Sequence, residues 1–180
     1  MIRKLMGISL LAFLCCGAIG CGTTKLTWTS DPEIQKVSND IFDAELRPVG
    51  IKSGDTQTYK AFLLFLKNKT DKELEIVWDK TLFIHNGQMN GGFMFEGIIH
   101  EDRDKPKPPA RVIPGGTFRK KIWPNSLVFF FVPERARFSG GAWIHRELNP
   151  GQNGVYLTVK SGQREVNEMI TLNISVQNSD

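Results

Sequence analysis

The stretch VYLTVKSGQREVNEMITLNISV, residues 155–176, decides the fold class. Apolar and polar residues alternate on both sides of Ser161-Gly162-Gln163, which is the pattern of two half-buried strands joined by a tight turn. One face of the second half carries only apolar side chains, namely Ile170, Leu172, Ile174 and Val176. We therefore predict an antiparallel hairpin whose apolar face lies on a core.

Similar short stretches, each bounded by turn-forming residues, recur towards the N-terminus. We expect strands at 41–47 (ended by Pro48), 58–67, 74–78 (continued at 82–85 beyond a bulge), 117–123, 127–132 and 143–148. Residues 58–67 are apolar on both faces, which predicts a central position in a sheet. With about eight or nine short antiparallel strands and no amphipathic helix, the chain is predicted to be all-β, with an immunoglobulin-like β-sandwich as the first choice.

The first 20 residues have the composition of an export signal. Arg3 and Lys4 precede an uncharged apolar run that is shorter than the about 20 residues needed to span a bilayer. The run ends in Ala18-Ile19-Gly20-Cys21, which resembles the lipobox of bacterial lipoproteins, although the family prefers Leu where Ala18 stands. The resemblance implies cleavage before Cys21 and attachment of acyl chains (palmitate among them) to its thiol. Gly22, where an Asp would retain the protein at the inner membrane, implies the outer membrane.

Two alternatives remain for this segment: a plain secretory signal with an incidental Cys21, or an N-terminal membrane anchor. All 3 cysteines lie at or before position 21, so the mature domain would contain no disulfide and would depend on its core alone. Two or three acyl chains would anchor the protein stably, at about 0.8 kcal/mol per buried methylene.

We expect residues 1–20 to be the signal peptide, 21–40 to be the lipidated Cys and a polar tether, and 41–180 to form a single domain. Trp28, Ile34 and Val37 indicate that part of the tether packs on that domain. Loss of Arg3 and Lys4 with the signal lowers the formal net charge from +4 to +2, which gives no argument for nucleic-acid binding.

Sequence patterns typical of a catalytic or metal site are weak. His85, His100 and His145 are far apart and lack the spacing of metal ligands. Residues 100–104 are rich in oxygen ligands but lack the glycine of a calcium loop and contain Arg103, so a solvated loop is predicted. Ser139 lacks the first glycine of G-x-S-x-G. We therefore assign no catalytic, cofactor or metal residue, and we expect no enzymatic activity.

Aromatic residues are numerous, with 4 Trp and 12 Phe. The favoured interpretation is that they fill a core without disulfides; the alternatives are a stacking platform for sugars and an apolar surface for a protein partner. The run Val128-Phe129-Phe130-Phe131-Val132 must place apolar side chains on both faces of one strand. If that strand lies at an edge, it is a candidate partner surface.

Asn68-Lys69-Thr70 with Trp78-Asp79, and Asn86-Gly87 with Gly91-Gly92-Phe93, resemble an uncharacterised family of β-rich envelope lipoproteins, for which the resemblance implies no activity. The leading hypothesis is a non-enzymatic binding or assembly module, held by its lipid at the outer membrane and facing the periplasm, with an envelope protein or polysaccharide as partner. The alternatives are a carbohydrate-binding module, which needs exposed coplanar Trp rings, and a hydrolase of cell-wall or carbohydrate substrates, which needs two facing acidic groups in a cleft.

Overall fold

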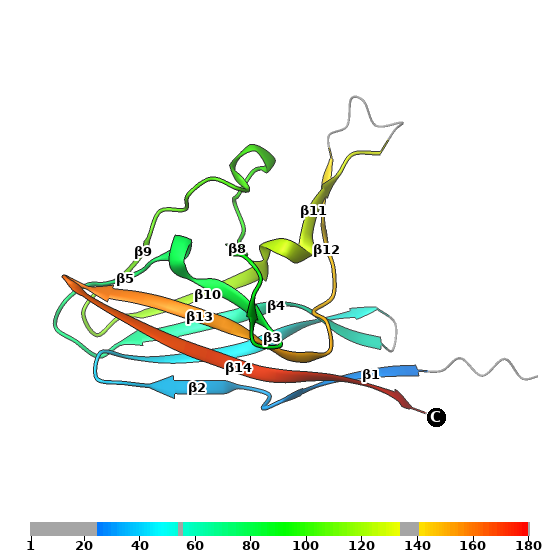
Figure 1. Cartoon of the computed structure of the whole chain (residues 1–180), viewed down its shortest axis with the longest axis horizontal. Helices are drawn as coiled ribbons and strands as arrows, with labels where there is room; N and C mark the ends of the chain where they lie inside the picture. Colours follow the sequence, from blue (N-terminus) through cyan, green and yellow to red (C-terminus); the bar gives the residue numbers. More distant parts are fainter. Residues whose placement is uncertain (1–24, 54–55, 134–140, 180) are drawn as a thin grey trace, which may run out of the picture.

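The computed structural model describes residues 25–53, 56–133 and 141–179, and this part of the chain is all-β. It contains fourteen strands in three antiparallel sheets, together with three single-turn 3₁₀ helices. The two larger sheets form facing layers, and the third is a two-stranded ribbon that projects from them (Figure 1). The count exceeds the expected eight or nine strands because several strands have only two to four residues.

Strands distant in the sequence become neighbours in both larger sheets. In spatial order, the first sheet runs β1 (Lys25–Asp31), β14 (Arg164–Ser179), β13 (Gly151–Ser161), β5 (Leu74–Ile76) and β9 (Ala110–Val112), with β6 (Leu82–His85) also on β13 and β7 (Gln88–Met89) on β6. The second runs β2 (Gln35–Ser38), β3 (Phe42–Ser53), β4 (Thr56–Asn68), β10 (Thr117–Pro124) and β8 (Phe93–Met94). The ribbon pairs β11 (Val128–Phe131) with β12 (Ala142–His145), and the 3₁₀ turns are η1 (Trp78–Lys80), η2 (His100–Asp102) and η3 (Asn125–Leu127).

One apolar core lies between the two larger sheets. The second sheet contributes alternate residues of β3 and β4, and the first contributes alternate residues of β13 and β14. The fully buried side chains include Phe42, Leu46, Phe62, Leu64, Leu66, Leu157 and Ile170. This packing is the main stabilising term, since burial of apolar surface contributes roughly 25 cal/mol per Å².

The hairpin predicted from residues 155–176 is confirmed. β13 and β14 pair from Gly151↔Ile174 to Ser161↔Arg164, and the turn at Gly162 has the positive φ that favours glycine. The central position expected for residues 58–67 is also confirmed, because β4 is the middle strand of its sheet. The continuation of residues 74–78 is confirmed as well, since β5 and β6 pair with successive parts of β13 on either side of η1.

Three predicted strand boundaries are wrong. β3 does not end at Pro48 but continues to Ser53, because its pairing with β2 reaches only to Leu46 and leaves an open edge where a residue without an N–H group is tolerated. Trp78 belongs to η1 rather than to a strand, and its ring is buried against Phe95 and Phe118. β12 ends at His145 instead of Leu148, because Leu148 turns into the core between the larger sheets.

Much of the expected tether belongs to the sheets. β1 pairs along its whole length with the C-terminal part of β14, and β2 pairs with β3. Trp28 and Val37 pack against the core, as their apolar character indicated. The described chain therefore joins the domain from Lys25 onwards.

A buried amide joins two loops, between β4 and β5 and between β9 and β10, at one end of the sandwich. Asn68 is fully buried, and its Nδ2 donates hydrogen bonds to the carbonyl oxygens of Lys72 (2.7 Å), Val112 (3.0 Å) and Ile113 (3.0 Å). Its Oδ1 accepts hydrogen bonds from the backbone N–H and the hydroxyl of Thr70, each at 2.9 Å. This side chain satisfies backbone groups that would otherwise be buried without partners.

We expect Asn68→Ala to lower the free energy of unfolding by about 3 kcal/mol, because it leaves several buried polar groups unpaired. Urea denaturation measures the change. Asn178→Ala, at an exposed position on β14, is the matched control and should stay within about 0.5 kcal/mol of the parent. Equal stability of the two variants would contradict the role given to Asn68.

Candidate functional site

The ribbon formed by β11 and β12 is the most unusual surface of the described chain, and we call it the aromatic ribbon. It rises from one side of the facing sheets, on the same side as the loop between β8 and β9 (Figure 1). Within the described residues, neither of its strands pairs with any strand outside the ribbon. β11 is therefore an edge strand, which is the condition under which the Val128–Val132 run was expected to be a candidate partner surface.

The two faces of the aromatic ribbon differ in burial. Opposite residues pair as Val128↔His145, Phe129↔Ile144, Phe130↔Trp143 and Phe131↔Ala142, so alternate pairs share a face. The pairs Val128/His145 and Phe130/Trp143 form the inner face, which is mostly covered, with the Phe130 and Trp143 rings edge-to-face at 5.2 Å. The other two pairs form the outer face.

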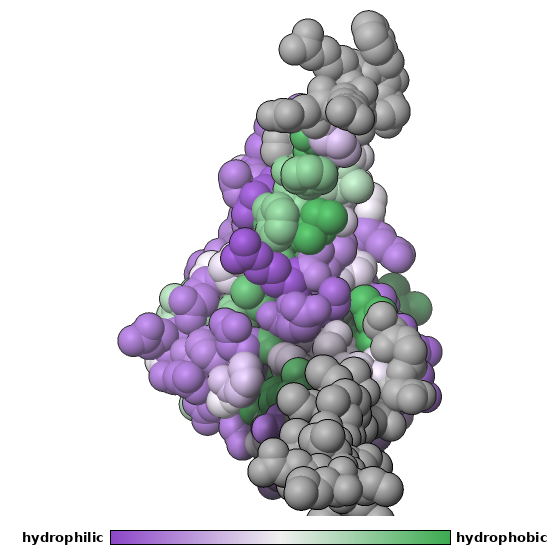
Figure 2. Space-filling model, turned by 90° about the vertical axis from the view of Figure 1, so that its right-hand side faces the viewer, coloured by the Kyte–Doolittle hydropathy of each residue, from purple (hydrophilic) through white to green (hydrophobic). Residues whose placement is uncertain are grey.

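The outer face is apolar and open to solvent. Phe131 is 52% exposed and Ile144 is 39% exposed, and Val132 beyond the end of β11 is 56% exposed. Apolar side chains gather on this projecting part, whereas polar ones dominate the surface below it (Figure 2). Exposed apolar groups on an unpaired strand edge are unfavourable for a monomer unless a partner covers them.

The base of the aromatic ribbon is held by backbone hydrogen bonds. Arg146 N–H donates to the carbonyl of Leu127 (2.9 Å), Leu148 N–H donates to Tyr59 (2.7 Å), and Asn125 N–H donates to Gly92 (2.9 Å). A β-bulge lies beside this base, since Val49 pairs with Ala61 and Gly50 with Tyr59, which leaves Lys60 as the extra residue of β4. Bulges re-aim side chains, and Lys60 forms an ion pair with Glu147 (3.0 Å).

An aromatic notch lies where the inner face of the ribbon meets the second sheet. It is a cavity of about 200 Å³ between the start of the β8–β9 loop and the side chains of Trp123, Trp143 and His145. The Trp123 and His145 rings are 4.9 Å apart, and the Lys121 ammonium lies 5.0 Å from the centre of the Trp123 ring. The notch therefore combines two rings in tilted contact with a nearby cation.

His145 is held in its neutral form by this environment. Burial lowers its pKa, and the positive charges of Lys121 and Lys60 lower it further. Its Nδ1 is buried, and no described residue offers it a hydrogen bond. The folded pKa of His145 lies below its unfolded value, so the unfolded chain binds the proton more readily. The folded state is therefore most stable, with respect to this group, above about pH 6.5 and loses that stability as the pH falls.

The residues considered from sequence do not converge on one site. Cys21 and Ser139 lie outside the described residues. His85 makes a contact of 3.3 Å with Asn153 on the first sheet, whereas His145 belongs to the ribbon. Residues 100–104 form η2 and a charged loop, where Asp102 pairs with Lys105 at 2.7 Å. Within the described ranges, no three His, Cys, Asp or Glu side chains are grouped as a metal site would require.

The tryptophans divide between core and surface. Trp78 and Trp123 are buried at 4% and 9% exposure, whereas Trp28 and Trp143 are half-buried. Trp28 lies on β1 and Trp143 on β12, and they line different cavities. They therefore do not form the single coplanar platform that the sugar-binding alternative requires.

Several carboxylates are held in their ionised form by basic partners. Hydrogen bonds from Arg164, Lys60 and Lys80 lower the pKa of Asp40, Glu147 and Glu165, respectively. A hydrogen bond from Ser38 lowers that of Asp43. A general acid needs a shift in the opposite direction, so these four groups do not suit that role.

We expect an NMR titration to give His145 a pKa below the ordinary value of about 6.5, and Lys121→Gln to raise it, because the substitution removes a nearby positive charge. Arg111→Gln, an exposed cation on the other sheet, is the control and should leave the pKa of His145 unchanged. A pKa at or above 6.5 in the parent would contradict the environment described for the notch.

Comparison of the chain with protein-family models, with curated proteins and with solved structures finds no match. Across the described ranges, no helix has both the length and the apolar character needed to cross a membrane. What the chain does must accordingly be argued from the aromatic ribbon and its surroundings.

Proposed function

We propose that this chain is an envelope lipoprotein, anchored through a lipid on Cys21, whose β-sheet domain is a non-enzymatic binding or assembly module. The aromatic ribbon is the contact surface, and the partner is an extended segment of another envelope protein. The anchor would hold the domain on the periplasmic face of the outer membrane.

The observation that carries this proposal is the outer face of the aromatic ribbon. It combines exposed apolar side chains at Phe131 and Ile144 with an open strand edge on a rigidly held base. An extended peptide that adds to such an edge gains backbone hydrogen bonds, while alternate side chains provide specificity. Large apolar side chains near the centre of an interface contribute most of its binding energy.

The finer fold assignment, an immunoglobulin-like sandwich, is part of this proposal. It is supported by the facing antiparallel sheets and by a chain that passes repeatedly between them, for example from β4 to β5 and from β9 to β10. Sandwiches of this type commonly bind partners through segments at their ends. In this chain the projecting ribbon would take that role.

A photo-crosslinking residue in place of Ile144 tests the contact surface in intact cells. We expect crosslinks to a specific envelope protein from position 144. We expect none from position 169, where Met169 is the matched control because it is also apolar and 60% exposed, but lies on β14. Equal crosslinking from both positions would show that apolar exposure alone, and not the ribbon, determines the contact.

Charged substitutions on the outer face should weaken the association. We expect Phe131→Asp and Ile144→Asp each to reduce co-purification of the crosslinked partner by at least about tenfold, since an interface anchor typically contributes about 1–2 kcal/mol or more. Met169→Asp should leave it unchanged. Thermal unfolding of each variant must match the parent, because the substituted side chains are exposed.

The anchor is tested by the intact mass of protein extracted from membranes, compared with a Cys21→Ser variant. We expect a mature N-terminus at Cys21 with added acyl mass, and loss of that mass in the variant. An unmodified Cys21 or a retained Met1 would contradict the anchor, while the crosslinking test of the ribbon would still stand by itself.

A further inference from the structure

A second cavity lies at the base of the aromatic ribbon, between β1, β4 and the segment that follows β12. Its volume is about 630 Å³, within the range of about 300–1,000 Å³ usual for small-molecule sites. It is lined by residues of β1, β4 and η3 and by residues 146–149, which follow β12. The notch around Trp123 and Trp143 shares none of these residues.

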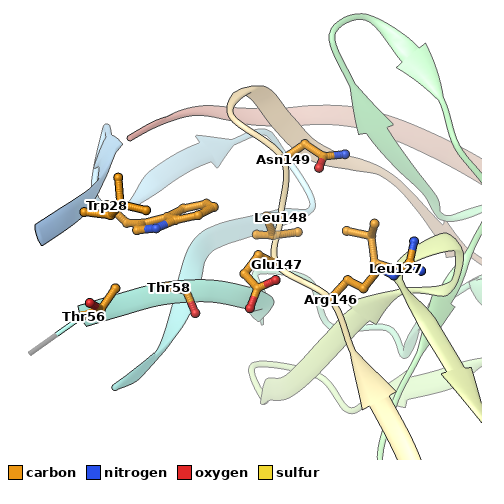
Figure 3. A pocket seen from close by; sticks show the side chains of 9 residues that line it. Trp28, Thr56, Thr58, Leu127, Arg146, Glu147, Leu148 and Asn149 are labelled. Atoms are coloured by element: carbon orange, nitrogen blue, oxygen red, sulfur yellow. The ribbon is translucent and has the colours of Figure 1, made fainter. Parts of the chain in front are cut away.

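Apolar side chains lie at both ends of this cavity. The indole of Trp28 reaches from β1 towards Leu148, and Leu127 lies at the other end beside Arg146 (Figure 3). Leu148 is fully buried and Trp28 packs on the core, so both side chains are fixed by the domain behind them. A hydrocarbon body placed in this cavity would contact Leu26, Trp28 and Leu127.

The two charged side chains of the cavity, Glu147 and Arg146, differ in whether an oppositely charged group lies beside them. Glu147 is paired with Lys60 at 3.0 Å, and the hydrogen bond from Lys60 lowers its pKa, so its negative charge is already compensated. Arg146 stacks over Phe129, with its guanidinium carbon 4.9 Å from the ring centre. Among the residues that the structure describes, no carboxylate lies within ion-pair distance of Arg146.

An exposed guanidinium on an aromatic ring is well placed to receive an anion. The Phe129 ring contacts the guanidinium, and the planar fork of its N–H groups matches a carboxylate or phosphate. Thr58 and Asn149 add polar groups to the wall. The cavity therefore has a cationic end next to an apolar channel.

We propose that this cavity binds a small anionic amphiphile, a molecule with one hydrocarbon body and one carboxylate or phosphate group. The hydrocarbon lies along Leu26, Trp28 and Leu127, and the anionic group pairs with Arg146. This site goes beyond the proposed partner contact, because the residues that bind the amphiphile lie outside the two strands of the ribbon, although Arg146 contacts Phe129 of the outer face.

The test titrates the full chain with octanoate by isothermal calorimetry and by tryptophan fluorescence. Octyltrimethylammonium, which has the same chain length and a positive charge, is the matched probe. We expect octanoate to bind and to change the fluorescence, and we expect Trp28→Phe to remove that change. Arg146→Gln should weaken octanoate binding by about tenfold, and Arg146→Lys by less, because lysine keeps the charge but not the planar fork.

Lys121→Gln is the control for a general effect of positive charge, since Lys121 lies by the notch and not in this cavity. It should leave octanoate binding unchanged. Equal or tighter binding of octyltrimethylammonium would assign the cavity to Glu147 and overturn the proposal, as would unchanged binding in Arg146→Gln or absence of octanoate binding.

Vesicles that contain an anionic phospholipid form the last arm of the test. The proposal expects octanoate to bind in the absence of vesicles. Vesicle binding that depends on Arg146, without any binding of free octanoate, would assign the guanidinium to a membrane surface and overturn the proposal. Crosslinking from position 144 is independent of all these outcomes.

Discussion

The contact between the apolar face of β3–β4 and that of β13–β14 is the interaction on which the rest of the structure depends. The described residues contain no cysteine, so no disulfide supports this contact. Phe42, Leu64, Leu157 and Ile170 are instead fully removed from water between the sheets. Everything else at the candidate site is attached to this layer pair. Leu148 enters the core from the segment after β12, and Trp28 joins it from β1.

This dependence explains how an exposed ribbon can have a defined geometry. A two-stranded ribbon alone is only marginally stable in water. The aromatic ribbon is held instead by its inner face, which packs on Trp123 and Met94, and by the backbone bonds of Arg146 and Leu148 at its base. On its outer face Phe129 contacts Arg146, whereas Phe131 and Ile144 are exposed and free for a contact with another molecule.

The bulge in β4 lies between the Arg146 cavity and the aromatic notch and affects the charges of both. By inserting Lys60 as an extra residue, it places a cation where it pairs with Glu147 and adds to the positive field at His145. With Glu147 compensated, Arg146 is the charged group that defines the cavity on one side of the ribbon base. On the other side, neutral His145 belongs to an aromatic notch. One local irregularity of the backbone thus adds a positive charge that acts on both, although burial and Lys121 have larger effects on His145.

The sequence by itself determined the strand class and the main hairpin, because alternation along residues 155–176 depends only on the two-residue period of a strand. It also identified the Val128–Val132 run as unusual. Apolar side chains on both faces of a strand require that each face be buried, either within the domain or against another molecule. Cys21 stays a prediction from the resemblance of its segment to a lipobox. Only the tertiary structure decided that β3 passes Pro48, that Trp78 leaves the strand for the core, and that Trp28 and Arg146 line one cavity. These features depend on which strands are neighbours, and pairing between residues far apart in the chain leaves no local pattern in the sequence.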